Sequence, residues 1–344
     1  MPKARPLGDN PPRHGGVSGM AAISVKDLTK SYGGVRAVDG ICFEVRPGEI
    51  FGLLGPNGAG KTTTIECLEG LRVPDGGAIR VLGRDPRRDR YELHERIGVQ
   101  LQATALHDRI RVGEALRLFA GLYRRRGPWG RRWAQLLEPL GLADKLRQYY
   151  HSLSGGQKQR LHIALALVHG PELVFLDELT TGLDPQARRA VWAFLEEIRD
   201  RGTTIFLTTH YMEEAERLCD RVAVMDRGRI LALGSPAELI ARLGGESRIV
   251  FRLLPTSPAD TDAGRLDAKP KAPPAGLEGM PHVRRVRLEE KDGRIVIYST
   301  KSSATLAALI REAEARGWDL RDLHVQRATL EDVFLALTGR ELRE

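Results

Sequence analysis

Short apolar runs separated by glycine and proline turns open the chain, between residues 22 and 54. AISVKDLTKSY and GICFEV mix apolar and polar positions, whereas IFGLLG is almost continuously apolar, so all three predict strands. Immediately afterwards, GPNGAGKTTTIECLEGL passes from glycines into helical spacing. The pattern therefore predicts an antiparallel layer that leads into a buried strand, a loop and a helix.

A mostly helical, arginine-rich section follows, from residue 92 to about residue 152. Its clearest amphipathic segments are RVGEALRLFAGLYRRR and RRWAQLLEPLGL. We therefore expect a helical lobe at about residues 92–152, inserted into the main domain.

Helices and apolar strands alternate from residue 153 onward. A helix in LSGGQKQRLHIALALVHG precedes strand ELVFLDE, helix DPQARRAVWAFLEEIRD, strand TTIFLTTH, helix YMEEAERLC and strand RVAVMDRG. Such alternation indicates an α/β domain in which helices cover a largely parallel sheet. This pattern ends near Leu243, so the main domain is predicted at residues 21–244.

Two further segments flank the main domain. Residues 245–344 predict a small accessory α+β domain with strands RIVFRLL, VRRVRLEE, RIVIYST and LRDLHVQ, a helix at 303–316 and a last helix in TLEDVFLALTG. The stretch at about 255–280 is rich in Pro, Ala and Gly, which predicts a flexible insertion that does not pack. Residues 1–20 lack the apolar stretch of a secretory signal and predict a flexible leader.

Composition and charge narrow the class of protein. With 42% hydrophobic and 28% charged residues, the chain of 344 residues predicts a globular fold that is larger than one core. No apolar run approaches the roughly 18 to 20 residues that cross a bilayer. The cysteines show no C-x-x-C spacing, so neither a disulfide framework nor a zinc site is indicated. The net charge of +8 suits nucleic acid, an anionic membrane or nucleotide phosphates and does not choose among them.

The segment GPNGAGKT at residues 55–62 satisfies the phosphate-binding pattern G-x-x-x-x-G-K-[ST]. Glycines are needed because backbone N–H groups must wrap closely around phosphate oxygens, and the following helix adds its positive end. Lys61 would reach the β and γ phosphates, and the Thr62 hydroxyl would coordinate magnesium. The alternative is a glycine-rich turn that only caps a helix. The predicted nucleotide-binding residues are Gly55, Pro56, Asn57, Gly58, Ala59, Gly60, Lys61, Thr62 and Thr63.

Two further motifs have features of a phosphate site. LSGGQ places Ser154, Gly155, Gly156 and Gln157 at a predicted helix N-terminus, although in isolation Ser154 would be interpreted as a simple N-cap. LVFLDE is an apolar strand that ends in two carboxylates, Asp177 and Glu178. Acids at that position suit a site at the carboxyl edge of a sheet, and the alternative is that they only solvate the end of the strand.

Taken together, GPNGAGKTT, LSGGQ, LVFLDE, GLDP and a late TTH resemble, in order and spacing, the ATP-binding-cassette (ABC) ATPases. The resemblance covers about residues 23–243. It implies a P-loop NTPase cassette with a mixed sheet, an antiparallel β subdomain and an inserted helical lobe. It also implies ATP and Mg²⁺ as cofactors and a second copy of the chain as partner, with the LSGGQ of one copy facing the P-loop of the other.

The resemblance also implies roles for the acids and for a histidine. Asp177 would hold magnesium, directly or through water, and Glu178 would activate the attacking water as general base. His210 matches the switch histidine, which is expected to contact the γ phosphate and to hold Glu178 and the water in line. Lys61 joins Glu178 and His210 in the catalytic group.

Tyr32, Asp184 and a glutamine complete the implied site. Tyr32 stands where an aromatic ring stacks on adenine, and its alternative is a core tyrosine. Asp184, in GLDP, lies in a loop that crosses the dimer, and an N-cap role is compatible with this one. The catalytic, magnesium-sensing glutamine is predicted at Gln102, although Gln100 stays open because residues two apart in a strand point the same way. Leu179 replaces the family's usual proline, which affects backbone stiffness rather than chemistry.

TLEDVFLALTG and RIGVQLQATAL resemble cassettes of bacterial drug exporters of the daunorubicin-resistance type. That resemblance implies a homodimer docked on a separately encoded transmembrane permease at the cytoplasmic face of the cell membrane. ATP hydrolysis would then power export of a drug-like or lipophilic substrate. The alternative is a soluble ABC ATPase acting on nucleic acid or ribosomes. Because the coiled-coil insertions, zinc motifs or second cassette typical of that class are not seen, no nucleic acid partner is expected.

Overall fold

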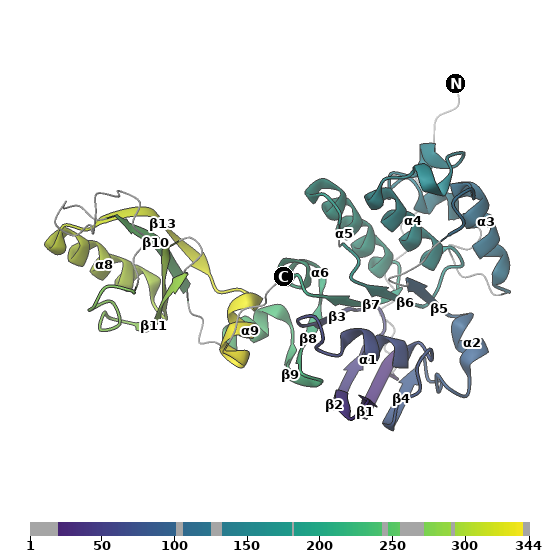
Figure 1. Ribbon diagram of the computed structural model, residues 1–344, viewed down its shortest axis with the longest axis horizontal. Coiled ribbons are helices and arrows are strands. Elements are labelled where there is room, and N and C mark those ends of the chain that lie inside the picture. The colour runs from purple at the N-terminus through teal and green to yellow at the C-terminus, as the bar shows by residue number, and fades with distance from the viewer. Residues whose placement is uncertain are drawn as a thin grey trace, which may run out of the picture.

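The computed structural model describes residues 20–100, 106–124, 133–180, 182–242, 247–254, 272–289 and 293–339. Figure 1 shows two lobes, with the helix α9 (Leu330–Thr338) between them. The larger lobe holds the predicted cassette, and the smaller one holds most of the predicted accessory domain.

The cassette is built on a six-stranded sheet with the order β5-β6-β7-β3-β8-β9. All neighbouring strands are parallel except β9, which runs antiparallel to β8. Parallel strands buried on both faces explain the nearly continuous apolar runs in the sequence. The strands are β3 (Ile50–Leu54), β5 (Ile97–Gln100), β6 (Leu173–Asp177), β7 (Thr204–Thr209), β8 (Arg221–Asp226) and β9 (Arg229–Gly234).

One face of this sheet is covered by α1 (Lys61–Leu68) and by an antiparallel sheet of β2 (Val35–Val45), β1 (Ile23–Tyr32) and β4 (Gly76–Val81), as Figure 1 shows. Phe51, Phe175 and Phe206 fill this layer, and the Phe51 and Phe206 rings stack at 5.7 Å between centroids. The antiparallel layer predicted from the first sequence runs is therefore confirmed.

Helices cover the opposite face. They are α4 (Gly155–Leu167), α5 (Pro185–Asp200) and α6 (Met212–Leu218), and α3 (Val112–Leu122) packs against α4. Their apolar residues share a core with Ile50, Val174 and Leu176, which alternate along the strands with the phenylalanines of the other face. As a result, α1 and α4 lie on opposite faces of the six-stranded sheet.

The section predicted as a helical lobe, at about residues 92–152, differs in part from the prediction. It contains the end of α2 (Arg90–His94), and then β5, which belongs to the main sheet, so the lobe starts only after that strand. Beyond α3, the described residues form three short 3₁₀ helices, Trp133–Leu136, Ala143–Lys145 and Tyr150–Ser152. Leu136, Leu137, Leu140 and Leu142 are all fully or almost fully buried, so their spacing reflects burial from several sides rather than one helical face.

The smaller lobe is an antiparallel sheet with the order β11-β12-β10-β13, covered on one face by α8. The predicted strands and helix are confirmed, while the insertion at about 255–280 is corrected in part. Residues 255–271 lie outside the described residues, but 272–280 are described, and Leu277 is fully buried in the core of this lobe. The elements are β10 (Ser247–Leu254), β11 (Val283–Glu289), β12 (Arg294–Ser299), α8 (Ser302–Arg316) and β13 (Asp319–Arg327).

The last helix, α9 (Leu330–Thr338), does not pack as the predicted boundary at residue 244 implies. Its apolar residues Leu330 and Phe334 belong to the cassette core, where α9 contacts α6 and α7 (Pro236–Arg242). Asp332, also on α9, accepts a hydrogen bond of 2.9 Å from the Tyr298 hydroxyl of the smaller lobe. The sequence predicted this helix but not which lobe would cover its apolar residues.

Among the described residues, no helix combines the length and the apolar character needed to cross a bilayer.

Candidate active site

Backbone crowding at the end of β3 explains the glycines of the P-loop. A Cβ added to Gly55 would lie 2.1 Å from the carbonyl oxygen of Met225, and one added to Gly60 would lie 2.2 Å from that of Ala37. Gly60 also has φ of 105°, a conformation that L side chains rarely adopt. These two glycines are therefore required by the fold of the loop itself.

The N-terminus of α1 is open to an anion. Its N-cap is Gly60, which makes no side-chain cap, and its first turn carries no acidic residue. The backbone N–H groups at this end are therefore not satisfied by a side chain and are suited to phosphate oxygens. Asn57 and Gly58 of the same loop are exposed.

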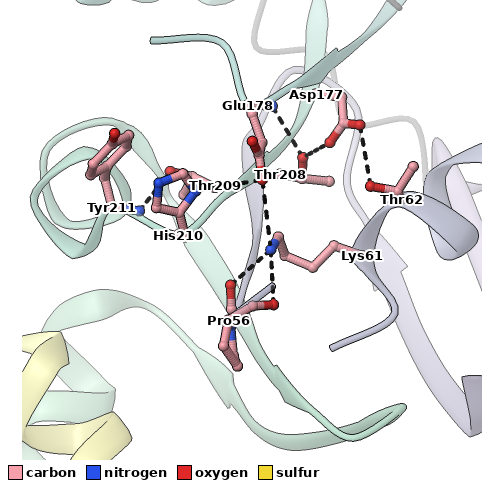
Figure 2. Close-up of polar contacts among 10 residues, drawn as sticks. Pro56, Lys61, Thr62, Asp177, Glu178, Thr208, Thr209, His210 and Tyr211 are labelled. Carbon is pink, nitrogen blue, oxygen red and sulfur yellow. Dashed lines mark hydrogen bonds and ion pairs between the residues drawn. The ribbon is translucent and has the colours of Figure 1, made fainter. Parts of the chain in front are cut away.

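Lys61 lies inside the loop rather than on its surface. Its side chain is 5% exposed, and Nζ donates to the carbonyl oxygens of Gly55 at 2.8 Å and Pro56 at 3.1 Å (Figure 2). Burial lowers the pKa of Lys61, and the charges of Glu178 and Asp177 act in the opposite direction. The ammonium is thus held beside the loop by carbonyl dipoles, which a phosphate could replace.

Asp177 and Thr62 bring two oxygens together at the carboxyl edge of the sheet. Asp177 Oδ2 accepts a hydrogen bond of 3.4 Å from Thr62 Oγ1, and Oδ1 accepts one from the Thr208 hydroxyl (Figure 2). Burial raises the pKa of Asp177, and the Thr208 hydrogen bond and the charge of Lys61 oppose this effect.

These oxygens fit a magnesium ion. Mg²⁺ prefers oxygen ligands and is usually held by one or two carboxylates together with substrate phosphates. In the described part of the chain, no cluster of three or more His, Cys, Asp or Glu forms an all-protein metal cage. A hydroxyl and a carboxylate beside a phosphate loop match that mode of binding.

Glu178 leaves the strand in an unusual backbone conformation. Its φ is 48°, in the left-handed region, which costs about 1 to 3 kcal/mol for a residue that is not glycine. Its carboxylate is 21% exposed, and Oε1 lies 3.5 Å from His210 Nδ1 and 4.0 Å from Lys61 Nζ. Figure 2 shows Glu178 between the histidine and the lysine. The strained turn thus directs the second acid toward the P-loop rather than along β6.

The structure therefore brings five predicted residues together from three segments: Lys61, Thr62, Asp177, Glu178 and His210. Tyr32 lies elsewhere, at the end of β1, and is 40% exposed, so it is not a core tyrosine. The Arg72 guanidinium lies 5.2 Å and the Lys30 ammonium 5.5 Å from the centroid of its ring.

The signature motif LSGGQ forms a complete helix cap. Ser154 is the N-cap of α4, where its Oγ accepts a hydrogen bond of 3.3 Å from Gln157 N, and Gln157 Oε1 accepts one of 3.0 Å from Ser154 N. Asp184 likewise caps α5 through the N–H groups of Gln186 and Ala187. Since α4 and α1 lie on opposite faces of the main sheet, the structure does not bring LSGGQ to the P-loop of the same chain.

The structure describes only one of the two candidate glutamines. Gln102 lies outside the described residues. Gln100 is 3% exposed, and its Oε1 has no hydrogen-bond partner. It pairs in parallel register with Leu176, so its side chain lies on the face of Leu176, opposite to that of Asp177. In this conformation Gln100 is directed away from the magnesium ligands.

Two contacts near the acids were missed by sequence reasoning. The Thr208 hydroxyl donates to Asp177, and Gln159 Nε2 of α4 donates to the Leu179 carbonyl at 2.9 Å. The first follows from the register of β6 against β7, in which Asp177 and Thr208 are partners. The threonines of TTIFLTTH were the available signal, but strand register is not visible in a single sequence.

Known proteins match both the sequence and the fold. A family model described as ABC transporter matches residues 38–181. Over 323 residues, the chain is 35% identical to the linearmycin resistance ATP-binding protein LnrL of Bacillus subtilis (strain 168). The aligned region covers 94% of this chain and 100% of that protein. This chain belongs to the ABC transporter ATP-binding proteins. As members of this family do, it binds and hydrolyses ATP.

Two further similarities agree with this membership. The ABC protein is 38% identical over 325 residues to the daunorubicin resistance ATP-binding protein DrrA3 of Streptomyces coeruleorubidus, covering 94% of this chain and 97% of that one. A solved structure of an ATP-binding subunit of an ABC transporter is 32% identical, with a TM-score of 0.60, and covers 65% of this chain and 93% of its own. The predicted family and fold class are confirmed, and these relatives give no support to the nucleic-acid alternative.

Proposed function

We propose that two copies of this ABC protein close on two ATP·Mg²⁺ and thereby power export of a drug-like or lipophilic substrate through a separate transmembrane permease. The observation that carries the proposal is that the phosphate loop, both acids and the histidine meet at one sheet edge, while LSGGQ lies on the other side of the same sheet. Half of the phosphate-binding surface is thus presented outward, where only another molecule can use it.

Each residue at the sheet edge then has a chemical task. Lys61 would leave its carbonyl partners to bind the β and γ phosphates, and the open end of α1 would add backbone N–H donors. Thr62 and Asp177 would hold Mg²⁺, which offsets phosphate charge when bound. Glu178 would take a proton from the attacking water, and His210 would keep that carboxylate in line. Tyr32 would stack on adenine, since part of its ring is open to solvent.

The homodimer would complete each site. Ser154 and Gly155 at the start of α4 are exposed, and the exposed Asp184 stands at the start of α5. A second copy placed head to tail would bring these groups against the γ phosphate bound by its partner. ATP would therefore hold the two copies together, and hydrolysis would release them.

The cargo and location are inferred from the relatives. Linearmycin resistance and daunorubicin resistance are the activities named for two of them, which supports a drug-like or lipophilic substrate. The permease would be a separate polypeptide, and the ABC protein would lie on the cytoplasmic face of the cell membrane, where ATP is available. Co-purification of a transmembrane protein with the tagged chain from membranes tests this part, and exclusive recovery with nucleic acid or ribosomes would contradict it.

The substitution Glu178→Gln tests the assignment of the base. Because Gln keeps the shape of the side chain but cannot accept the proton, we expect ATP binding to persist and steady turnover to fall by about 10²- to 10⁴-fold. The variant should also accumulate as an ATP-bound dimer, which size-exclusion chromatography with light scattering measures.

Glu92→Gln is the matched control, because Glu92 is 65% exposed and pairs with Arg84 away from the site. It should behave as the unmodified chain does. Unchanged turnover in Glu178→Gln would remove Glu178 from the role of base.

A further inference from the structure

A polar cluster, most of it buried, includes residues that stand beside Glu178 and His210 in the sequence. It consists of Thr180, Arg188, Trp192, Thr209 and Glu214, which we call the Glu214 cluster. Thr180 follows Glu178 by two residues, Thr209 precedes His210, and Glu214 lies on α6. Thr180, Thr209 and Glu214 are each 1% exposed. A carboxylate is thus enclosed between the loop that carries the proposed base and the loop that carries the proposed switch.

Glu214 is bonded to one segment of the chain and lies near two others. Trp192 Nε1 on α5 donates to Glu214 Oε1 at 3.3 Å. Burial raises the pKa of Glu214, and the hydroxyls of Thr209 and Thr180 lie near enough to act against this effect. Even so, Glu214 Oε2 and Thr180 Oγ1 have no hydrogen bond of good geometry. The carboxylate therefore lies within reach of both loops but is not fully paired with either.

Unpaired buried atoms are concentrated at this place. Besides Glu214 Oε2 and Thr180 Oγ1, they include Arg188 Nε, and His210 Nδ1 has no hydrogen bond although it lies 3.5 Å from Glu178 Oε1. A buried polar atom without a partner is costly, so native proteins rarely gather several of them. A small shift of either loop that pairs these atoms would recover part of this cost, which makes a second arrangement of the two loops accessible.

The same place receives a contact from the signature helix. Gln159 of α4 donates to the carbonyl oxygen of Leu179, between Glu178 and Thr180. Gln159 thus joins α4 to the segment after Glu178, while Glu214 lies near Thr180 of that segment and near Thr209, which precedes His210. A carboxylate suits this position because its two oxygens can accept hydrogen bonds from both hydroxyls at once.

We propose that Glu214 is a positioning residue that ties the segment after Glu178 to the loop of His210, so that the base and the switch histidine move together when the dimer closes. This inference rests on the roles proposed above for Glu178 and His210. Glu214 itself touches neither nucleotide nor water in this scheme; it fixes the angle between the two loops. If its role were only to pair Trp192, then removing the Trp192 donor should have the same effect as changing Glu214.

Steady-state ATP hydrolysis by the purified full chain, together with ATP affinity and thermal unfolding, tests this assignment. For Glu214→Gln we expect kcat to fall about tenfold, with ATP affinity within about twofold of the unmodified chain, because the P-loop is untouched. Trp192→Phe removes the ring N–H that donates to Glu214 but leaves both loops in place. It should lower the melting temperature as much as Glu214→Gln does and leave kcat unchanged.

Thr180 supplies a second pair of variants in case Glu214→Gln does not fold. Thr180→Val removes the hydroxyl with little change of shape and should lower kcat about as much as Glu214→Gln does. Thr180→Ser keeps the hydroxyl, so its kcat should equal that of the unmodified chain. The double variant Glu214→Gln/Thr180→Val should be no slower than either single one, since both break the same tie.

Equal kcat in Glu214→Gln, Thr180→Val and the unmodified chain would overturn the proposal. So would a loss of ATP affinity that parallels the loss of kcat, because that would indicate general damage. Glu178→Gln keeps the two hypotheses separate: if it is inactive while Glu214→Gln is normal, the tie fails and the catalytic roles stand; if Glu178→Gln is active, the proposed roles fail.

Discussion

Two glycine-rich helix ends define the chemistry of this chain, and they are built differently. α1 begins at Gly60 without a side-chain cap, and its loop is so crowded that a Cβ there would meet the Ala37 carbonyl. α4 begins at Ser154 with a full capping box, and a Cβ on Gly155 would meet nothing within 4 Å. Backbone atoms of the surrounding chain crowd the glycine at the first helix end, whereas the glycine at the second has open space in front of it. The same residue type is therefore needed for the fold in one place and for an approach from outside in the other.

Replacing Gly60 should have the largest effect. Gly60→Ala adds a Cβ 2.2 Å from a backbone oxygen at φ of 105°, so the loop must move, and ATP binding should fall by at least about a hundredfold. Titration with a fluorescent nucleotide measures this loss. Gly58→Ala is the control, because Gly58 also has a positive φ but a Cβ there meets nothing within 4 Å. This variant strains the backbone without a collision, so it should lose less ATP binding than Gly60→Ala. Equal binding by all three chains would show that the crowding is not needed.

Mixing two inactive variants should sharpen the comparison. Lys61→Ala damages the phosphate loop and Ser154→Ala damages the signature, so each homodimer should be nearly inactive. In a mixed dimer, one of the two shared sites has both parts intact. Random pairing should therefore restore about a quarter of the normal turnover. Absence of any recovery, with mixed dimers verified by two different tags, would contradict a shared site.

Replacing Gly155 should separate stability from turnover. Gly155→Ala meets no atom within the chain, and alanine is the better helix former, so the free energy of unfolding should rise by roughly 0.5 to 1 kcal/mol. Turnover should nevertheless fall about tenfold, because the added methyl group would stand between α4 and the partner's phosphate. Chemical denaturation and ATPase assays on the same preparation measure both quantities. A stabilised variant with normal turnover would show that no close approach occurs there.

The opposite end of α1 offers the smallest and most specific effect. Glu69 is 2% exposed, and burial, then Asp177 and Glu66, raise its pKa to about 8. Because the folded pKa lies above the unfolded one, the associated stability is complete below about pH 4.5 and is lost as the pH rises through 8. Glu69→Gln should therefore stabilise the chain more at pH 8.5 than at pH 5.5, by roughly 1 to 3 kcal/mol.

Thermal unfolding at the two pH values measures this difference. Glu92→Gln is the control, since Glu92 is 65% exposed and pairs with Arg84, and it should show no such gain at high pH. A constant difference between Glu69→Gln and the unmodified chain at both pH values would contradict the buried acid.

Local patterns allowed much of the site to be predicted. The glycines, Lys61, Thr62 and the two acids each follow a strand along the chain, so strand, loop and helix order was enough to place them at one edge. The rest depends on tertiary register. Gln100 and Gln102 are equivalent in a strand pattern, and only the pairing of Gln100 with Leu176 shows its direction. Glu214 resembles any helix glutamate in the sequence, because its burial comes from α5 and from the two loops.

The packing of α9 against the cassette core has a consequence for how the polypeptide is made. Leu330 and Phe334 complete an apolar core whose other members begin at Ile50, and Glu216 of α6 accepts a hydrogen bond of 2.6 Å from Leu330 N. A ribosome therefore has to deliver the residues up to Phe334 before the helix that follows His210 receives its cover. Truncation at residue 244 would leave that helix with an uncovered apolar side, so the nucleotide-binding lobe reaches its finished form only after α9 has been made.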